Sequence, residues 1–192
     1  MHPAYLSTDR LTLRAMVAAD ATVSMSWFPA PFPVSAGQAD RWLADAHRSS
    51  PWDDPATLWL AILRRGSDGD GSRDVVVGVV RLLHPRARTS DLSVHLAPHL
   101  THEEADALQG EVVRLTVPWV RDELEAMVLT LSIGSDQPAT IAAAEELGMI
   151  QAVRLREYLA RSGHRADLLW YQALNPRGRI LDAQAMEGGS GA

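Results

Sequence analysis

The stretch APHLTHEEADALQGEVV, residues 97–113, joins an expected strand to an expected long helix. An alternating apolar and polar segment ends at Ala97, and an amphipathic helical pattern is established by Val112. Between them, Thr101 and Glu104 have the spacing of a capping box, in which each side chain accepts a backbone N–H of the other residue. This spacing predicts a helix that begins at about residue 102.

The first turns of this expected helix are acidic, with carboxylates at Glu103, Glu104 and Asp106. A carboxylate near a helix N-terminus is stabilised by the helix dipole, by roughly 0.3–1 kcal/mol each. The same charges repel a phosphate, the ligand that strand-to-helix junctions often hold through a glycine-rich loop. The stretch offers one glycine, Gly110, so we expect any phosphate cradle here to be degenerate.

Periodicity along the rest of the chain predicts a mixture of strands and helices. Strands are expected at 6–14, 57–65, 75–83, 89–98, 127–134, 150–159 and 166–174, and helices at 20–27, 36–48, 102–124 and 139–148. The three strands within 57–98 form an expected antiparallel meander. A long helix between two strands connects parallel neighbours, so segments 92–97 and 127–133 are expected to run parallel.

Length and composition fit one globular domain. The chain has 192 residues, of which 46% are hydrophobic and 22% are charged, which supplies enough apolar side chains for one well-buried core. We expect a single domain over 1–175 and a flexible tail over 176–192, whose end is rich in glycine.

Charge and cysteine content exclude several classes of function. The formal net charge of −6 argues against non-specific binding of nucleic acid or of an anionic membrane. The absence of cysteine from the sequence excludes a disulfide, a thiolate nucleophile and a cysteine-ligated metal. The first residues do not resemble a signal peptide, and no apolar run approaches the roughly 18 residues of a membrane span, so a cytoplasmic location is expected.

Four segments carry a resemblance to a known family. They are LSTDRLTLRAMVAADA (6–21), VHLAP (94–98), QPATIAAAEELGM (137–149) and LREYLARSGHRADLLWYQAL (155–174). Together with the order of strands and helices, they resemble the GNAT N-acetyltransferase superfamily, and within it the branch that acetylates the N-termini of ribosomal proteins. The resemblance covers about residues 6–175.

The resemblance implies an α+β fold with a mixed sheet. We expect a central, mostly antiparallel sheet of six to seven strands flanked by about four helices. In this family the fourth and fifth strands splay apart, so segments 92–97 and 127–133 are expected to diverge at their C-terminal ends.

The resemblance also implies an enzyme that transfers an acyl group from acyl-CoA to an amine. The simplest reaction moves acetyl from acetyl-CoA, the co-substrate, to a primary amine of a small molecule or of a protein N-terminus. In this family the pantetheine arm lies between the splayed strands, which would place Leu96 and Ala97 beside the thioester. Their backbone N–H groups would then stabilise the oxyanion of the tetrahedral intermediate.

The family's Asn-x-x-Ser motif corresponds here to Gln137 and Thr140. By resemblance, Gln137 belongs to the cofactor site, and the hydroxyl of Thr140 would contact the cofactor and protonate the departing thiolate. The alternative is that Thr140 only caps or packs the start of its helix.

The family's pyrophosphate loop, Gln/Arg-x-x-Gly-x-Gly/Ala, has no clear counterpart between Pro98 and Glu111. One alternative is that the helix starts early and the loop is lost. The other treats 101–108 as an inserted turn and leaves Gln109 and Gly110 as a residual cofactor-binding loop. Loss of the loop favours two rival functions: a catalytically silent domain that binds a ligand or a protein partner, and an enzyme with a donor other than CoA.

Histidines near the same junction raise two further hypotheses. His95, His99 and His102 lie close to Glu103 in the sequence, but their spacing matches no known ligand motif, so no metal is expected. His95 or His99 is a candidate general base for the amine, because an imidazole titrates near neutral pH.

Overall fold

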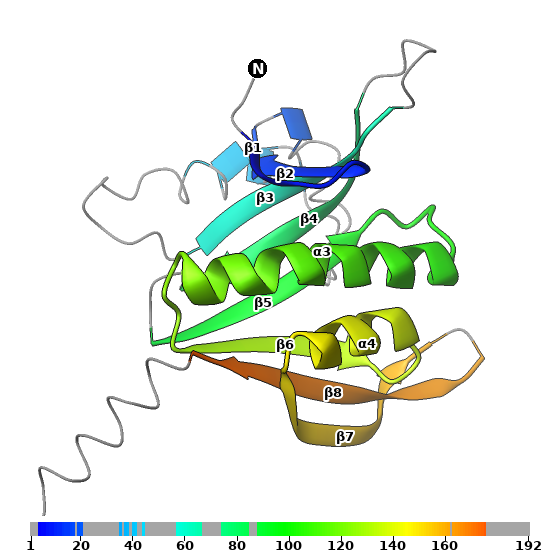
Figure 1. The fold of residues 1–192 in the computed structure, drawn as a ribbon. Helices are drawn as coiled ribbons and strands as arrows, with labels where there is room; N and C mark the ends of the chain where they lie inside the picture. Colours follow the sequence, from blue (N-terminus) through cyan, green and yellow to red (C-terminus); the bar gives the residue numbers. More distant parts are fainter. Residues whose placement is uncertain are drawn as a thin grey trace, which may run out of the picture.

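The computed structural model describes residues 4–17, 19–20, 35, 37–38, 40–41, 44, 57–66, 74–84, 88–161 and 163–175. In this part of the chain, eight strands form one sheet in the order β1-β2-β3-β4-β5-β6-β8-β7 (Figure 1). All neighbours are antiparallel except β5 and β6, which are parallel. The strands are β1 Ala4–Ser7, β2 Leu11–Ala15, β3 Thr57–Arg64, β4 Val75–Leu83, β5 Thr89–Leu96, β6 Val128–Gly134, β7 Ile150–Ala160 and β8 Arg165–Leu174.

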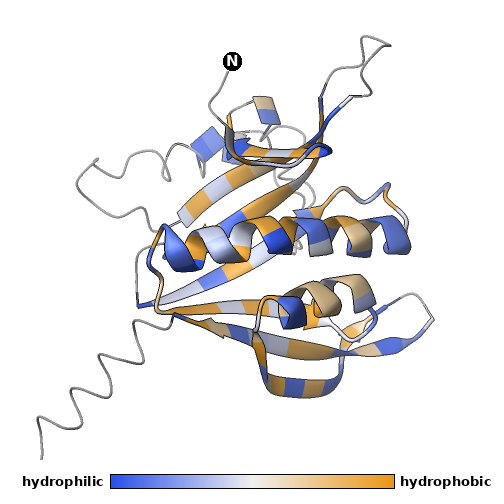
Figure 2. Ribbon diagram, viewed as in Figure 1, coloured by the Kyte–Doolittle hydropathy of each residue, from blue (hydrophilic) through white to orange (hydrophobic). Residues whose placement is uncertain are grey.

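Two helices, α3 His102–Asp122 and α4 Pro138–Glu146, lie over the same face of the sheet (Figure 1). The buried side of α3 joins one core cluster with strand residues such as Leu60 and Leu131, which are at most 1% exposed. Figure 2 shows hydrophobic residues along the strands beneath these helices. The apolar residues of α3 in that core are Leu108, Val112, Val113, Val117 and Val120.

The expected fold class is confirmed, but the number of strands differs. Segment 6–14 was expected to form one strand, and a turn at Thr8 divides it into β1 and β2. The Thr8 hydroxyl accepts the backbone N–H of Arg10 at 3.2 Å and of Leu11 at 3.0 Å, which stabilises this turn. The resulting hairpin brings the sheet to eight strands instead of six or seven.

Two of the four expected helices, 102–124 and 139–148, correspond to α3 and α4. The expected helices at 20–27 and 36–48 fall mostly outside the described residues, and the expected tail at 176–192 lies wholly outside them.

The predicted parallel pair and its divergence are confirmed in β5 and β6. The last ladder pair between them joins Leu92 to Leu131. Both strands continue past it, to Leu96 in β5 and to Gly134 in β6. There β5 stays paired with β4, and β6 stays paired with β8. Each strand keeps its outer partner, so the two can separate from each other without leaving the sheet.

Candidate active site

The backbone of β5 beyond Leu92 is oriented by its ladder with β4. The N–H of Ala97 donates to the carbonyl of Val77 across 2.9 Å, so it points toward β4. In an antiparallel ladder, the backbone groups of successive residues point to opposite sides. Those of Val94 and Leu96 therefore point to the side from which β6 has moved away.

Leu96 and Ala97 were both expected to donate a backbone N–H to the oxyanion, but their N–H groups point to opposite sides of β5. Leu96 presents its N–H on the side of the diverging strands, as that role requires. The N–H of Ala97 already donates to Val77 of β4. The expectation that this N–H would contact the oxyanion is therefore corrected. Val94 shares the orientation of Leu96 and was missed, although the period-two alternation of a strand is a signal that identifies it.

Gly78 in β4 lies opposite Leu96 and fixes how closely the two strands approach. A Cβ at this position would lie 2.6 Å from Leu96 Cδ2 and 2.9 Å from the carbonyl oxygen of His95. Any other residue would displace the end of β5. The signal in the sequence is an isolated glycine inside a β-branched run, which marks a close approach of backbone.

His95 is half-buried in β5. Burial, followed by the positive charge of Arg81, lowers the pKa of His95 from 6.5 to about 4. At neutral pH its imidazole is uncharged and accepts a proton poorly, which disfavours it as the general base. His99, the other candidate, is exposed in the loop before α3.

The start of α3 is capped by its own side chains, as the sequence predicts. The hydroxyl of Thr101 accepts the N–H of Glu104 at 3.2 Å. In return, Oε2 of Glu104 accepts the N–H of Thr101 at 3.0 Å and its hydroxyl at 2.9 Å. These hydrogen bonds lower the pKa of Glu104. The predicted helix over 102–109 is confirmed, and a carboxylate occupies the helix end that would otherwise attract an anion.

Gln109 and Gly110 lie inside α3, not in a loop. The side chain of Gln109 accepts a hydrogen bond from Gln137 Nε2 at 2.9 Å. Gly110 packs against the start of α4, where a Cβ would lie 2.8 Å from the carbonyl oxygen of Ala139. The alternative of a residual cofactor-binding loop is therefore wrong, because both residues are used in the contact between α3 and α4.

Gln137 is the N-cap residue of α4 but makes no side-chain cap to that helix. Its Oε1 instead accepts the N–H of Gly134 at 2.8 Å, and its Nε2 donates to Gln109. The side chain thus links the end of β6 to α3, at the place where the family resemblance expects a cofactor-site residue.

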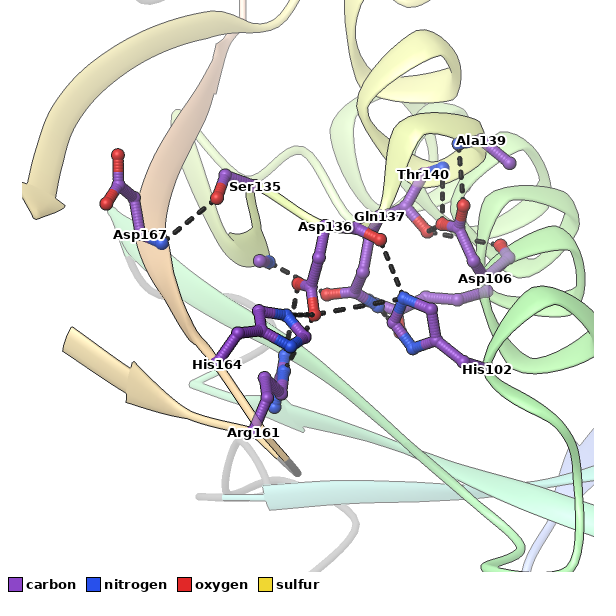
Figure 3. A network of polar contacts seen from close by, with 12 residues as sticks. His102, Asp106, Ser135, Asp136, Gln137, Ala139, Thr140, Arg161, His164 and Asp167 are labelled. Atoms are coloured by element: carbon purple, nitrogen blue, oxygen red, sulfur yellow. Dashed lines mark hydrogen bonds and ion pairs between the residues drawn. The ribbon is translucent and has the colours of Figure 1, made fainter. Parts of the chain in front are cut away.

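Thr140 lies in the first turn of α4 and is fully buried. Its hydroxyl is 2.7 Å from Asp106 Oδ1 and 3.2 Å from the Asp106 carbonyl oxygen (Figure 3). This placement agrees directly with the packing alternative. Donation to a thiolate would require the hydroxyl to leave Asp106, so the catalytic role of Thr140 stays a prediction.

Asp106 supplies the cap that α4 does not find in its own N-cap residue. Its buried carboxylate accepts the N–H of Ala139 at 2.8 Å and of Thr140 at 2.9 Å (Figure 3). The sequence placed Asp106 among the acidic residues of the first turns of the helix, with no sign of this partner. The one available hint was that glutamine is a poor cap for α4.

The histidines of this junction do not form a metal centre with their neighbours. Among the described residues, no group of three or more His, Asp or Glu side chains is placed to hold a metal ion. His102 has a different partner, since its Nε2 lies 2.7 Å from the carbonyl oxygen of Asp136.

Among the residues that the structure describes, no helix is long and apolar enough to cross a membrane.

Comparison with known proteins gives a family match. A family model described as "Acetyltransferase (GNAT) domain" matches residues 6–150. No curated protein matches the chain. Among solved structures, a provisionally assigned acetyltransferase from Sphaerobacter thermophilus is 43% identical, with a TM-score of 0.68, and the match covers 92% of this chain and 99% of that chain.

More distant structures share the fold. A spermidine N-acetyltransferase from Vibrio cholerae in complex with CoA and spermine is 17% identical, with a TM-score of 0.58, and the match covers 90% of this chain and 99% of that chain. A dodecameric structure of spermidine N-acetyltransferase from the same organism is 18% identical, with a TM-score of 0.59 and coverage of 88% and 96%.

Proposed function

The chain belongs to the GNAT acetyltransferase family, and on that premise we propose that it transfers an acetyl group from acetyl-CoA to a primary amine. One observation carries the proposal. Beyond the Leu92–Leu131 pair, β5 and β6 part, and the backbone of Val94 and Leu96 faces the side from which β6 has moved away. A pantetheine arm, with its two amides, has the hydrogen-bonding groups to pair with such a strand edge.

The chemistry at this edge follows from the orientation of Leu96. A neutral amine attacks the thioester carbonyl, a C–N bond forms, and the carbonyl oxygen becomes an oxyanion. In this proposal the N–H of Leu96, which points to the side of the diverging strands, donates to that oxyanion. The C–S bond then breaks and CoA leaves as a thiolate, while the nitrogen loses one proton to solvent water, so that the products are the amide and CoA.

Proton transfer has no strong base among the candidates. The pKa of His95, lowered to about 4 by burial and by Arg81, makes its imidazole a weak proton acceptor at neutral pH. The proposal therefore has the amine arriving unprotonated. Thr140 is kept as the candidate acid for the thiolate, on the condition that its hydroxyl exchanges Asp106 for the sulfur.

The acceptor is proposed as a class, the primary amines. The opening segment 6–21 and the closing segment 155–174 resemble the branch that acetylates ribosomal protein N-termini, which favours a peptide amine. The spermidine N-acetyltransferases that share the fold make a small polyamine the second candidate.

A second candidate function is supported by the start of α3. The capping box engages the N–H groups of Thr101 and Glu104 and places a carboxylate at the helix start, where a pyrophosphate would otherwise bind. This feature favours a catalytically silent domain, or an enzyme with a donor that lacks the pyrophosphate.

Calorimetric titration with acetyl-CoA and CoA, followed by an assay of thiol release, tests these functions. We expect binding of both, and thiol release in the presence of spermidine or of a peptide with a free N-terminus. An N-terminally blocked peptide that contains no lysine is the matched control. Absence of binding and of thiol release would reject the proposal. Release from S-acetylpantetheine alone would indicate a donor without phosphates.

A further inference from the structure

Basic side chains from separate segments meet at the carboxylate of Asp136, in the turn between β6 and α4 (Figure 3). The Nε of Arg161, just after β7, donates to Oδ2 of Asp136 at 2.9 Å. The Nε2 atoms of His102, at the start of α3, and of His164, just before β8, each lie 3.8 Å from the same oxygen. We refer to His102, Arg161 and His164 as the basic triad.

Gly134, the last residue of β6, leaves the space in which these side chains meet. A Cβ there would overlap Asp136 Oδ1 and would lie 2.9 Å from Arg161 Nη2. It would also lie 3.1 Å from Gln137 Oε1. A side chain at this position would therefore displace the ends of the Asp136 and Arg161 side chains from their present contact.

The triad has more donors than Asp136 can accept. A guanidinium has five N–H groups, and Asp136 accepts from Nε and, at 3.5 Å, from Nη2 of Arg161. The Nε2 of His102 faces the carbonyl oxygen of Asp136 at 2.7 Å, so this nitrogen carries the hydrogen and Nδ1 remains to be protonated. The side chains of His102 and His164 are 60% and 57% exposed, so a ligand from solution can reach them.

The cluster is suited to an anion by its donors. Arg161 carries a permanent positive charge, and the two exposed imidazoles add N–H groups beside it. Burial raises the pKa of Asp136, but the hydrogen bond and charge of Arg161, together with His102, outweigh burial and lower it. The turn into α4 adds no charge at Gln137, and on α3 the residue after His102, Glu103, is exposed to solvent.

The position of the cluster matches the path of the proposed donor. Gly134 ends β6 past the point at which β5 and β6 separate, so a pantetheine arm between these strands would carry its phosphates out beside the triad. We propose that His102, Arg161 and His164 bind a phosphate group of the acyl donor, in place of the helix end that Glu104 has capped. This inference rests on the proposed function.

The test compares Arg161→Gln with a matched variant of the same hairpin, Arg154→Gln. Arg154 pairs with Asp167 and does not contact Asp136, so its replacement removes the same charge outside the triad. CoA, dephospho-CoA and inorganic pyrophosphate are titrated calorimetrically into each protein. We expect Arg161→Gln to weaken CoA and pyrophosphate binding by about tenfold to a hundredfold, and Arg154→Gln to change neither by more than about twofold. Dephospho-CoA, which lacks the 3′-phosphate, shows which phosphate is bound. If Arg161→Gln loses affinity for CoA but not for dephospho-CoA, the triad binds the 3′-phosphate.

A second readout does not depend on the variants. In the unmodified protein, pyrophosphate should raise the NMR-titrated pKa values of His102 and His164, because an anion favours the imidazolium. CoA binding that Arg161→Gln leaves unchanged, with no shift of either histidine, would overturn the inference while acetyl transfer from acetyl-CoA still supported the proposed function. Failure of the unmodified protein to bind CoA or to release its thiol would reject both.

Discussion

The hydroxyl of Thr140 donates to a carboxylate oxygen of Asp106 across 2.7 Å, and this bond joins the first turn of α4 to the second turn of α3. The same carboxylate accepts the backbone N–H of Thr140 and of Ala139. Both Thr140 and Asp106 are buried. The residue that family resemblance nominates as an acid is therefore also a structural contact between two helices.

Thr140→Val separates these two roles, because it removes the hydroxyl and keeps the shape of the side chain. We expect the free energy of unfolding to fall by about 1–3 kcal/mol, since Asp106 loses one of its buried donors. If its hydroxyl is the acid of the proposed function, the turnover of the folded variant, measured by thiol release at saturating acetyl-CoA, should fall by about tenfold to a hundredfold. Thr140→Ser, which keeps the hydroxyl, is the control. An unchanged turnover of the valine variant would show that the thiolate leaves without this hydroxyl and that Thr140 serves only the contact with Asp106.

Gly110→Ala tests whether this glycine serves packing between helices. An alanine in a helix interior normally stabilises a protein by about 0.5–1 kcal/mol relative to glycine. Here the added Cβ would meet the Ala139 carbonyl at 2.8 Å, so we expect a net loss of about 1–3 kcal/mol in urea unfolding. Gly37→Ala is the control, because Gly37 has helical backbone and nothing within 4 Å of the added Cβ. Equal stabilisation by both substitutions would contradict the packing role.

The acidic start of α3 is expected to weaken CoA binding by charge repulsion. Glu103→Gln combined with Glu104→Gln should tighten CoA binding by about threefold to tenfold at low salt, and the salt dependence should flatten. Glutamine keeps an acceptor for the N–H of Thr101, so the cap is retained. The control is Glu123→Gln with Glu125→Gln, which makes the same change in charge near the other end of α3. A similar effect of both pairs would indicate net charge alone.

His95 should make stability depend on pH in the acidic range. Its pKa is about 4 in the folded protein and 6.5 in its ordinary state, so between these values the unfolded chain binds a proton that the folded protein does not. The contribution of the uncharged His95 to the free energy of unfolding is therefore complete above pH 6.5, and it is lost as the pH falls to about 4. Allowing for screening, we expect a loss of about 2 kcal/mol, measured by urea unfolding at several pH values.

In that experiment His95→Gln should remove the fall of about 2 kcal/mol in the free energy of unfolding that is assigned to His95. His99→Gln, at an exposed position, should retain this fall. An NMR titration of His95 in the folded protein gives the pKa directly. A midpoint near 6.5 for His95 would contradict this interpretation, because it would mean that burial does not disfavour the imidazolium.

Features encoded by neighbouring residues were predictable from the sequence. The capping box of Thr101 and Glu104 needs only a spacing of three residues, and it set the start of α3 correctly. Alternation and β-branched runs located the strands, and the long helix between β5 and β6 required them to be parallel. The segment wrongly predicted as one continuous strand, 6–14, contains a turn closed by the hydroxyl of Thr8 and by the backbone hydrogen bond from Thr8 to Leu11.

The sequence by itself thus determined the order of elements from β3 to β8, the family and the capped helix start, because each depends on local spacing or on a pattern repeated along a segment. Tertiary structure alone decided the partners within the site. Asp106 meets Thr140 across 34 positions, and Gln109 meets Gln137 across 28. Such contacts depend on how closely α3 and α4 pack, which Gly110 permits, and no spacing along the chain encodes that distance. The side chains gathered round Asp136 have the same origin, since they come together only when the hairpin between β7 and β8 folds over the end of β6.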